Sequence, residues 1–376
     1  MTVLHVSGAQ VWGGNEQQLT YLINDLDRLG VTQKIFCFSE TPLFNAVREL
    51  PIETLSSKPL SPYSAEYRSF FANVVKKHAI DIIHLHTSDS VTGYVVTDLI
   101  KNLKTPTLFA RKGIRNKTSF LSKQKYNYKN IHGILCISEY VKKHFGAILS
   151  EKNKKKLVTV YNGVKVEDIP KNAAFKLRDK LNLSAETFLI GNIANHTNAK
   201  DLPTLVKVVD HLVNELKVTD FHLIQIGDFS KNTDNLKELV REKNLDSYIT
   251  FMGFVENASS FLSQFNVFLM TSEREGGPSS IVEALYHKTP VISTKVGVVD
   301  EVIEDGVNGF TADVRDYVQL AKKIARFKSM PELSKQFSDL SYEIFLKKFT
   351  ADQLGKNTLA VYQKLVRENA ISKNKN

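Results

Sequence analysis

Short apolar runs recur along the whole chain, and no other feature of the sequence constrains its fold as strongly. The runs are rich in Val, Ile, Leu and Phe without strict polar alternation, which is typical of strands buried on both faces of a parallel sheet. Segments with helical apolar spacing, such as 16–29 and 201–216, separate them. The sequence therefore predicts an α/β fold in two successive halves. The predicted strands are 3–7, 34–39, 82–86, 107–111, 133–138 and 157–161 in the first half and 188–194, 222–227, 249–254, 267–271, 291–294 and 310–312 in the second.

The length of 376 residues suits two domains. Between the two sets of strands lies a stretch of mixed charge, 164–185, which follows Asn162-Gly163 and contains Pro170. Turn-forming residues of this kind mark a boundary. We predict a first domain over 1–168, a second over 169–351, and a helix over 352–370.

The composition disfavours several classes of protein. No apolar run approaches the roughly 20 residues that a membrane-spanning helix requires, and no secretory leader pattern follows Met1. Cys37 and Cys136 are the only cysteines, too few for a disulfide framework or a cysteine-based zinc site. We expect a protein of the reducing cytoplasm.

Positive charge is concentrated in one part of the chain. Residues 101–156 carry fifteen lysines and arginines but only two acids, Glu139 and Glu151, so this segment exceeds the net charge of +10 for the whole chain. This distribution predicts an anionic partner, which is an acidic membrane surface, a phosphate-bearing substrate or nucleic acid. A solvated lysine-rich surface is the alternative.

Two motifs of the first half follow predicted strands, where ligands bind in folds of this class. Gly13-Gly14 precedes a helix and suits a phosphate at the helix N-terminus, although a plain tight turn has the same sequence; the dinucleotide fingerprint and the P-loop are both absent. His84 and His86 share one strand face and are either satisfied polar residues or functional groups. Metal binding is the less favoured interpretation, because no Cys or carboxylate completes a ligand set.

The most informative stretch is Glu275-Gly-Gly-Pro-Ser-Ser-Ile-Val-Glu283. It joins a predicted strand to a helix that begins near Ser279 or Ser280, whose free N–H groups can bind an anion between two carboxylates. Glu275 would suit sugar hydroxyls and Glu283 the vicinal hydroxyls of a ribose. Alternatively, Glu283 only closes a capping box with Ser280, and Glu275 is a solvated loop acid. Lys200, just before another helix, either adds charge to a phosphate site or is an exposed loop lysine.

These motifs, in this order, resemble glycosyltransferase family 4, whose members are retaining, nucleotide-sugar-dependent enzymes of GT-B fold. The signature combines Glu275 and Glu283 with 284–285, 289–294 and 304–310. The resemblance implies two Rossmann-like, doubly wound domains facing a central cleft. The second domain would bind the nucleotide and the first mainly the acceptor, and the final helix would cross back to the first domain. Further matches lie at 12–16, 81–86, 137–138, 161–164, 195–201 and 227–228, so the resemblance covers nearly the whole chain.

The resemblance also implies roles for single residues. Lys200 would hold the diphosphate, Glu275 the donor sugar and Glu283 the ribose. His86 is the acceptor-side candidate. The other donor-binding candidates are Gly13, Gly14, Asn195, His196, Gly227, Phe254, Val255, Gly276, Gly277, Ser279, Ser280 and Ile281.

The chain departs from the family pattern at two places. Asn195 stands where the family commonly has an Arg, five residues before the Lys. After the strand over 107–111, where many members carry a His, this chain has Arg111 and Lys112. A His exchanges protons near pH 7 and an Arg does not. We therefore expect Arg111 or Lys112 to stabilise an anion, and we count both with Glu275 and Lys200 as catalytic candidates.

By this resemblance the predicted activity is sugar transfer, with retention, from a nucleoside diphosphate sugar to a saccharide or lipid-linked acceptor. The expected setting is bacterial surface polysaccharide or lipopolysaccharide synthesis. UDP is expected in preference to GDP, and neither a cofactor, a metal nor nucleic acid is expected to take part. The segment 101–156 would bring the enzyme to the inner face of an anionic membrane. The alternatives are a non-catalytic nucleotide-sugar-binding protein and another GT-B enzyme such as an epimerase.

Overall fold

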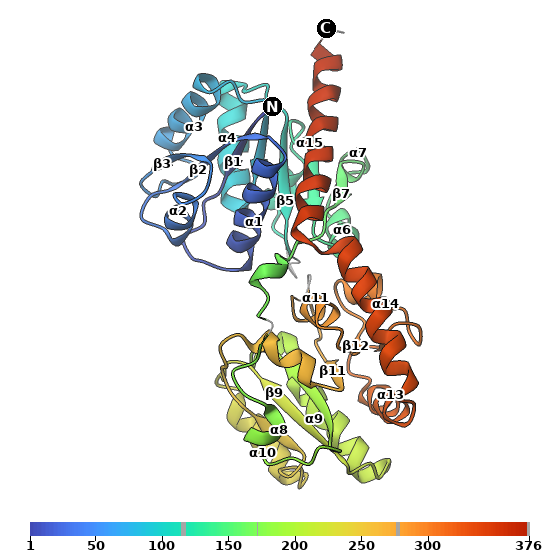
Figure 1. Ribbon diagram of the computed structural model, residues 1–376. Helices are drawn as coiled ribbons and strands as arrows, with labels where there is room; N and C mark the ends of the chain where they lie inside the picture. Colours follow the sequence, from blue (N-terminus) through green and yellow to red (C-terminus); the bar gives the residue numbers. More distant parts are fainter. Residues whose placement is uncertain (114–117, 171, 276–278, 374–376) are drawn as a thin grey trace. The chain divides into compact units, whose positions relative to one another are not determined.

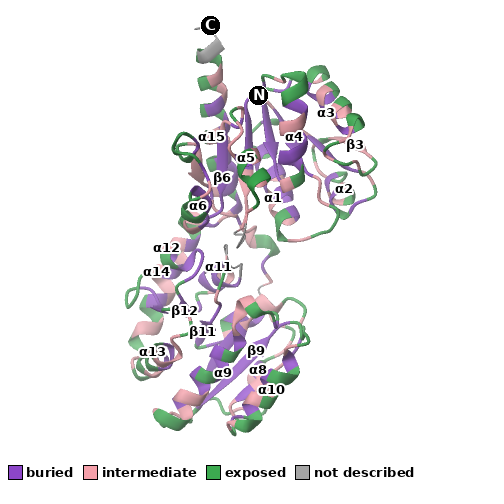
Figure 2. Ribbon diagram, turned by 180° about the vertical axis from the view of Figure 1, so that it is seen from behind, coloured by how far each residue is buried: buried purple, intermediate pink, exposed green. Residues whose placement is uncertain are grey.

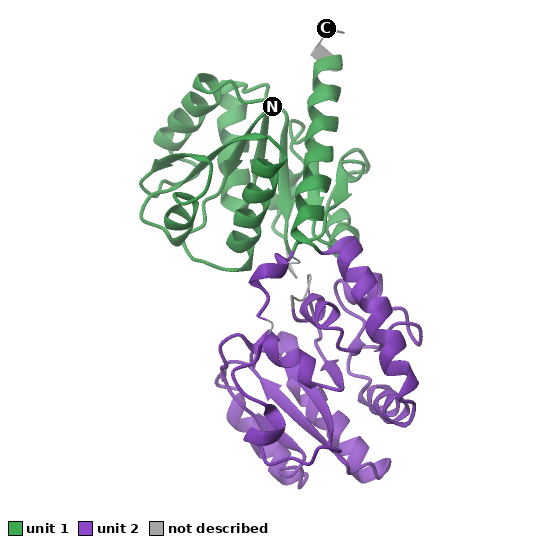
Figure 3. Cartoon of the chain, in the orientation of Figure 1, with its two compact units in different colours: residues 1–163, 350–376 green, residues 164–349 purple. Residues whose placement is uncertain are grey.

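The structure, a computed structural model, describes residues 1–113, 118–170, 172–275 and 279–373 (Figure 1). The chain forms two compact units: Met1–Gly163 with Thr350–Asn376, and Val164–Phe349 (Figure 3). The division after Gly163 comes five residues before the boundary predicted at 168. Each unit is built on one parallel sheet whose strands are largely buried (Figure 2).

The sheet of the first unit has seven strands in the order β3-β2-β1-β4-β5-β6-β7. Six of them follow the apolar runs of the sequence. The seventh, β3 (Glu53–Ser57), was not predicted, because it pairs only with β2 at the edge and none of its residues is fully buried. The other strands are β1 (Thr2–Val6), β2 (Thr32–Phe38), β4 (Ile82–Leu85), β5 (Thr107–Arg111), β6 (Gly133–Cys136) and β7 (Leu157–Thr159).

The last helix of the chain, α15 (Ala351–Lys373), belongs to the first unit although the whole second unit precedes it in the sequence. It packs against α1 (Gly14–Arg28), where a Cβ added to Gly355 would stand 2.5 Å from the Cβ of Asp25. Tyr362 and Leu365 are buried in one cluster with Leu22 of α1. The remaining helices are α2 (Pro42–Val47), α3 (Ala65–Lys77), α4 (Ser88–Lys101), α5 (Phe120–Tyr126), α6 (Glu139–Gly146) and α7 (Glu151–Lys154).

The sheet of the second unit has six strands in the order β10-β9-β8-β11-β12-β13, and all six were predicted. The strands are β8 (Phe188–Ile193), β9 (Phe221–Ile226), β10 (Ile249–Phe251), β11 (Val267–Met270), β12 (Val291–Thr294) and β13 (Phe310–Ala312). The α-helices are α8 (Leu177–Lys180), α9 (Leu202–Asp210), α10 (Thr233–Glu242), α11 (Ser279–Tyr286), α12 (Val299–Val302), α13 (Tyr317–Ser329) and α14 (Glu332–Lys348). The helix predicted over 201–216 ends as a π-helical turn, His211–Glu215.

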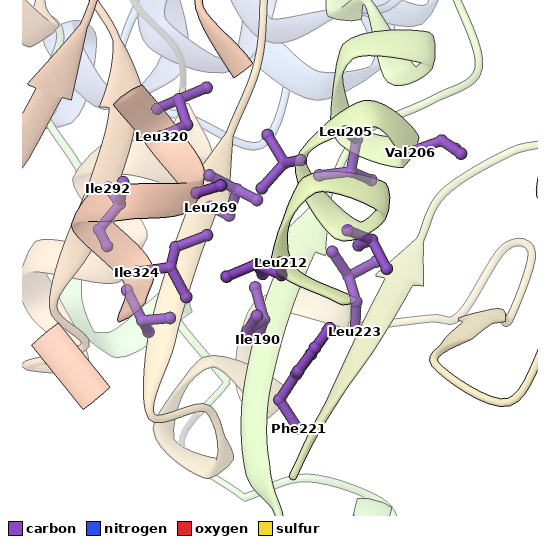
Figure 4. Packing of buried hydrophobic residues seen from close by; sticks show 14 of the residues in the cluster. Ile190, Leu205, Val206, Leu212, Phe221, Leu223, Leu269, Ile292, Leu320 and Ile324 are labelled. Carbon is purple, nitrogen blue, oxygen red and sulfur yellow. The ribbon is translucent and has the colours of Figure 1, made fainter. Parts of the chain in front are cut away.

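A large apolar cluster joins the sheet of the second unit to its helices α9 and α13. Ile190 and Leu223 of the sheet lie beneath Leu205 of α9, and Ile324 of α13 closes the cluster (Figure 4). All four side chains are at most 1% exposed. Each Å² of apolar surface that this layer removes from water contributes about 25 cal/mol to stability.

Within the described residues, no helix combines the length and apolarity needed to cross a bilayer.

Candidate active site

Each sheet has one point where the strand order reverses, between β1 and β4 in the first unit and between β8 and β11 in the second. The loops that leave the carboxyl ends of two such strands pass to opposite faces of the sheet and so leave a crevice, where ligands bind in folds of this class. In the second unit these two loops carry Lys200 and Glu275. We therefore place the candidate donor site there.

Lys200 and Glu275 form an ion pair, with 2.5 Å between Nζ and Oε1. Ser272 Oγ donates to the same carboxylate oxygen at 2.7 Å. The side chains of Lys200 and Glu275 are 25% and 11% exposed, so neither is the solvated loop residue of the alternative interpretation. The two loops are also joined by the backbone, since Glu273 N donates to Ala199 O at 2.8 Å.

This pair places one ammonium and one carboxylate at a single crevice. Two further N–H donors remain on an ammonium that bonds one carboxylate. A diphosphate that approaches Lys200 would compete with Glu275 for the ammonium, because phosphate oxygens and carboxylates accept the same charge-assisted hydrogen bonds. Displaced from Lys200, Glu275 would have an oxygen free for hydroxyl groups.

Glu283 lies within helix α11 and is partly buried. Burial raises the pKa of its carboxyl from 4.5 to about 7. The helix begins at Ser279, so Ser280 is already its second residue. An N-cap precedes the first helical residue, and the capping box proposed for Ser280 and Glu283 is therefore wrong. Ile281, predicted to lie near the donor, is fully buried, so only its backbone is placed to bind a ligand.

Asn195 and Gly227 join the loops that follow β8 and β9. Asp228 N donates to Asn195 Oδ1 at 3.0 Å. Gly227 has a φ of +156°, and a Cβ there would stand 2.0 Å from Ala194 O, so only glycine fits. The loops can approach this closely because the second one has no side chain at that position.

His196 does not offer a ring nitrogen to the crevice. Its Nε2 lies 2.8 Å from Gln225 Oε1 and its Nδ1 lies 2.8 Å from Thr233 Oγ1, and the residue is 3% exposed. These two bonds tie the loop after β8 to β9 and α10 and use both ring nitrogens, so the prediction of His196 as a donor-binding residue does not rest on its imidazole.

The other donor-binding candidates differ in what the structure describes. Phe254 follows β10 and is 71% exposed, and Val255 beside it is partly buried. Gly276 and Gly277 lie outside the described residues, and Ser279 is described only as the first residue of α11.

Gly13 and Gly14 open helix α1 at the reversal point of the first unit. Gly13 is the N-cap, and the N–H groups of Glu16 and Gln17 both bond Gly13 O at 3.1 Å. Lys112 reaches the same helix start, where its Nζ donates to Asn15 O at 2.9 Å. Burial lowers the pKa of Lys112 from 10.5 to about 8, and Glu16 opposes this shift.

Arg111 and Lys112 both border a pocket of about 300 Å³ at the carboxyl end of β5. The guanidinium of Arg111 lies 4.7 Å from the ring centroid of Phe145 and 5.9 Å from that of Tyr126. None of the described lining residues is an acid, so the pocket suits an anion. The others that line it are Asn15, His86, Thr87, Ser88, Val91, Phe109, Ala110, Gly113 and Tyr126.

The two halves of the chain match two glycosyltransferase families. Residues 12–168 match the family described as Glycosyltransferase Family 4, and residues 174–343 match Glycosyl transferases group 1. The chain belongs to glycosyltransferase family 4. This family assignment confirms the resemblance seen in the sequence.

Relatives and solved structures agree with this assignment. N-acetyl-alpha-D-glucosaminyl L-malate synthase of Bacillus anthracis is 21% identical over 86% of this chain and 85% of its own. Poly(ribitol-phosphate) alpha-N-acetylglucosaminyltransferase of Staphylococcus aureus is 24% identical over 63% of this chain and 45% of its own. The crystal structure of HepE from Anabaena with UDP superposes with a TM-score of 0.80, at 18% identity, over 97% of this chain and all of that one. The family 4 chain thus has the GT-B fold that its sequence predicted.

Three polar residues that bond predicted site residues were not predicted from the sequence: Ser272, His5 and Tyr362. Ser272 lies in the loop between β11 and Glu275, and this position was the only signal for it. His5 lies inside an apolar strand and pairs in register with His84, and no local pattern marks either that pairing or the place of Tyr362.

Replacing Glu283 with Gln is expected to stabilise the ligand-free protein above pH 7 and to change little at pH 5. The native carboxyl has a pKa of about 7, raised from 4.5 by burial. The native state therefore holds a proton that the unfolded chain releases, and stability falls as pH rises from about 4.5 to 7. We expect a gain of about 1–2 kcal/mol in the free energy of unfolding at pH 8, measured by urea titration. Glu238→Gln, at an exposed position of α10, is the control, and an equal response of both variants would contradict the prediction.

Proposed function

We propose that this family 4 enzyme transfers a sugar, with retention of configuration, from UDP-sugar to an anionic saccharide or lipid-linked acceptor. The observation that carries the proposal is the Lys200–Glu275 pair at the crevice between β8 and β11. It supplies one group for the diphosphate and one for the sugar hydroxyls. The relatives include enzymes of O-antigen and lipopolysaccharide core synthesis, which supports a role in surface polysaccharide synthesis.

The chemistry follows from the charges at this crevice. The bond between the anomeric carbon and the diphosphate oxygen breaks, and an oxocarbenium-like centre forms. Lys200 and the first N–H groups of α11 meet the charge that develops on the leaving diphosphate. The acceptor oxygen attacks from the face that the diphosphate leaves, and its proton passes to a diphosphate oxygen. Because Lys200 supplies the positive charge, we propose that no metal ion is needed.

UDP is the proposed nucleotide. HepE was crystallised with UDP and with UDP-glucose. In the present chain the exposed ring of Phe254 follows β10, where it can stack on a base. Glu283, with its pKa of about 7, can accept hydrogen bonds from a ribose diol.

A thermal-shift series with UDP, GDP, ADP and TDP tests the donor site. UDP at about 100 times its dissociation constant should add roughly 2.7 kcal/mol of stability. Lys200→Met should remove most of this shift, whereas Lys207→Met, at an exposed position of α9, should keep it.

Glu275→Gln should still bind UDP but lose about 100-fold or more in the rate of sugar transfer. EDTA should leave the transfer rate of the wild type unchanged. Binding of UDP-sugars without any transfer by the wild type would instead support a non-catalytic binding protein.

The proposed acceptor is an anion. Lys112 and Arg111 border the 300 Å³ pocket, and none of its described lining residues opposes their charge. Two relatives are named for acidic acceptors, L-malate and poly(ribitol-phosphate). Nearby, Lys125 Nζ bonds Ser88 Oγ at 2.9 Å and Thr92 Oγ1 at 3.0 Å, which orients one hydroxyl of the pocket wall.

The acceptor KM is expected to rise as pH passes about 8. Lys112 has a pKa lowered to about 8 by burial, so it loses its charge there and binds an anion less well. Lys112→Arg keeps the charge at all these pH values and should flatten the profile. The assay compares L-malate, poly(ribitol phosphate) and neutral glycerol as acceptors. Equal transfer to glycerol, or the same pH profile in Lys112→Arg, would contradict the proposal of an anionic acceptor. Neither result would bear on the proposed donor site.

We also propose that the first unit docks on an anionic membrane surface. Phe120 and Leu121 of α5 are 72% and 78% exposed, and they lie within the basic segment 101–156. Several described lysines of that segment are already bonded within the fold, namely Lys112, Lys125, Lys142, Lys154 and Lys156. The other exposed lysines of the segment are Lys101, Lys104, Lys123, Lys129, Lys143, Lys152 and Lys155.

Co-sedimentation with vesicles tests this surface. The wild type should bind phosphatidylcholine vesicles that contain phosphatidylglycerol and should not bind pure phosphatidylcholine. Replacing Phe120 and Leu121 with Ser should weaken binding several-fold. The matched control replaces Leu99 and Ile100 with Ser in the same way. These two residues are 66% and 60% exposed at the C-terminal end of α4. Equal loss in both double variants, or binding that ignores lipid charge, would overturn the proposal.

A further inference from the structure

A second pocket of the first unit, of about 280 Å³, lies where the chain leaves the carboxyl ends of β1, β2, β3 and β4. Two of its aromatic lining residues, Phe38 and Tyr67, are buried, at 6% and 3% exposed. Gln10 and Asp89 are exposed. The other residues that line it are Gly8, Pro59, Leu60, Ser61, Pro62 and Ser90. A largely apolar surface with a few polar groups is typical of sites for small molecules.

Tyr67 reaches this pocket from α3, which packs beside α4 (Figure 1). A glycine inside a helix is unfavourable, yet α4 has Gly93 at the point of contact. A Cβ on Gly93 would stand 2.3 Å from Cε1 and 2.7 Å from the hydroxyl oxygen of Tyr67. Gly93 therefore makes room for the phenol, whose hydroxyl end lies against α4.

The hydroxyl of Tyr67 has no hydrogen-bond partner among the described residues. Its oxygen is not one of the fully enclosed polar atoms of the fold, so a partner can reach it. Burial and the nearby charge of Asp89 raise the pKa of this phenol above its usual range, so the hydroxyl keeps its proton and can donate it. A nearly buried donor without a partner is unfavourable, and the pocket that Tyr67 lines is where a partner would lie.

Asp89 supplies a carboxylate to the same pocket from the first turn of α4. A Cβ on Gly8 would lie 3.6 Å from the Cβ of Asp89 and 3.7 Å from Cε2 of Phe38, so these three residues adjoin one another. Asp89 and Gly93 are four residues apart and share one face of the helix, and Tyr67 contacts α4 at Gly93. Within the described part of the chain, the Asp89 carboxylate has no ion pair or hydrogen bond.

We propose that this pocket binds one neutral pyranose ring through Asp89 and Tyr67. The carboxylate accepts hydrogen bonds and the phenol donates one, and sugar hydroxyls do both. The apolar C–H face of the ring would pack against Phe38 and the two prolines. An ammonium group would leave the phenol proton without an acceptor, and a phosphate would be repelled by Asp89. The volume is near the lower limit of roughly 300 Å³ for ligand pockets, which suits one ring and not an oligosaccharide.

This sugar pocket adjoins the 300 Å³ pocket that Arg111 and Lys112 border. Gly8 lines the first and Thr87 the second, and Gly8 N donates to Thr87 Oγ1 at 3.1 Å. An acceptor that fills both pockets would place its anionic group beside Lys112 and a neutral sugar beside Asp89. The acceptor would then be a glycan with an anionic unit. This last step rests on the proposed function, whereas the sugar pocket does not.

Saturation-transfer NMR of the full chain tests the sugar pocket, with the methyl pyranosides of glucose, galactose and N-acetylglucosamine as probes. At least one of them should bind. Tyr67→Phe should weaken its binding severalfold. Asp89→Asn should weaken it about tenfold, as expected for a lost hydrogen bond to a charged group. Glu275→Gln, which alters the proposed donor site, should leave this binding unchanged.

Two variants serve as matched controls. Tyr63→Phe removes an exposed hydroxyl from the loop between β3 and α3, and Glu66→Gln removes an acid from the first turn of α3. Both should bind the probe as the wild type does. Equal losses in the controls, no binding of any neutral pyranoside, or binding of the cationic methyl glucosaminide alone would overturn the proposal. No sugar is transferred in these measurements, so their failure is separable from failure of the proposed function.

Discussion

Parallel strands that are buried on both faces can hold charged groups only where the strands end. Both sheets obey this constraint: the residues of β4, β6, β9 and β11 are all buried. The side chains with candidate chemistry therefore gather in loops at the carboxyl edges, and above all where the strand order reverses. The same burial on both faces accounts for the position of α15. Tyr362 and Leu365 of this helix cover apolar residues on one face of the first sheet.

In the second unit the constraint brings opposite charges together. Lys200 and Glu275 leave different strands and meet at 2.5 Å, so the ligand-free crevice holds a neutral pair. A partly buried pair costs desolvation and returns less stability than its short distance suggests. Stability alone therefore does not account for this pair, and the proposed function gives each of its two members a separate part of one ligand to bind. Burial likewise raises the pKa of Glu283 to about 7, so its ionised form destabilises the fold.

In the first unit three buried histidines lie on or just after strands β1 and β4 without breaking this constraint, because all three are neutral. The fold accommodates them by keeping all three neutral and by linking His5 to Gln33 and His84 to Tyr362. One consequence is mechanical, since the hydrogen bond between Tyr362 and His84 ties the last helix to β4. The other is chemical, since neutral rings so close to Lys112 avoid a cluster of like charges.

The sequence by itself determined the two parallel sheets, the order of motifs and the family. Twelve of the thirteen strands were predicted, because a strand that is buried on both faces consists of a run of apolar residues. The polar edge strand β3 has no such run and could not be seen. The position of Glu275 and Lys200 after strands was also local information.

Only the tertiary structure decided which of these residues touch. Lys200 and Glu275 are 75 residues apart and His84 and Tyr362 are 278 apart, and no periodicity encodes such pairings. For the same reason His196 was predicted as a ligand-binding residue, although Gln225 and Thr233 use both of its nitrogens. A side chain's partners depend on the packing of distant elements, whereas its burial within a strand depends mainly on its neighbours in the chain.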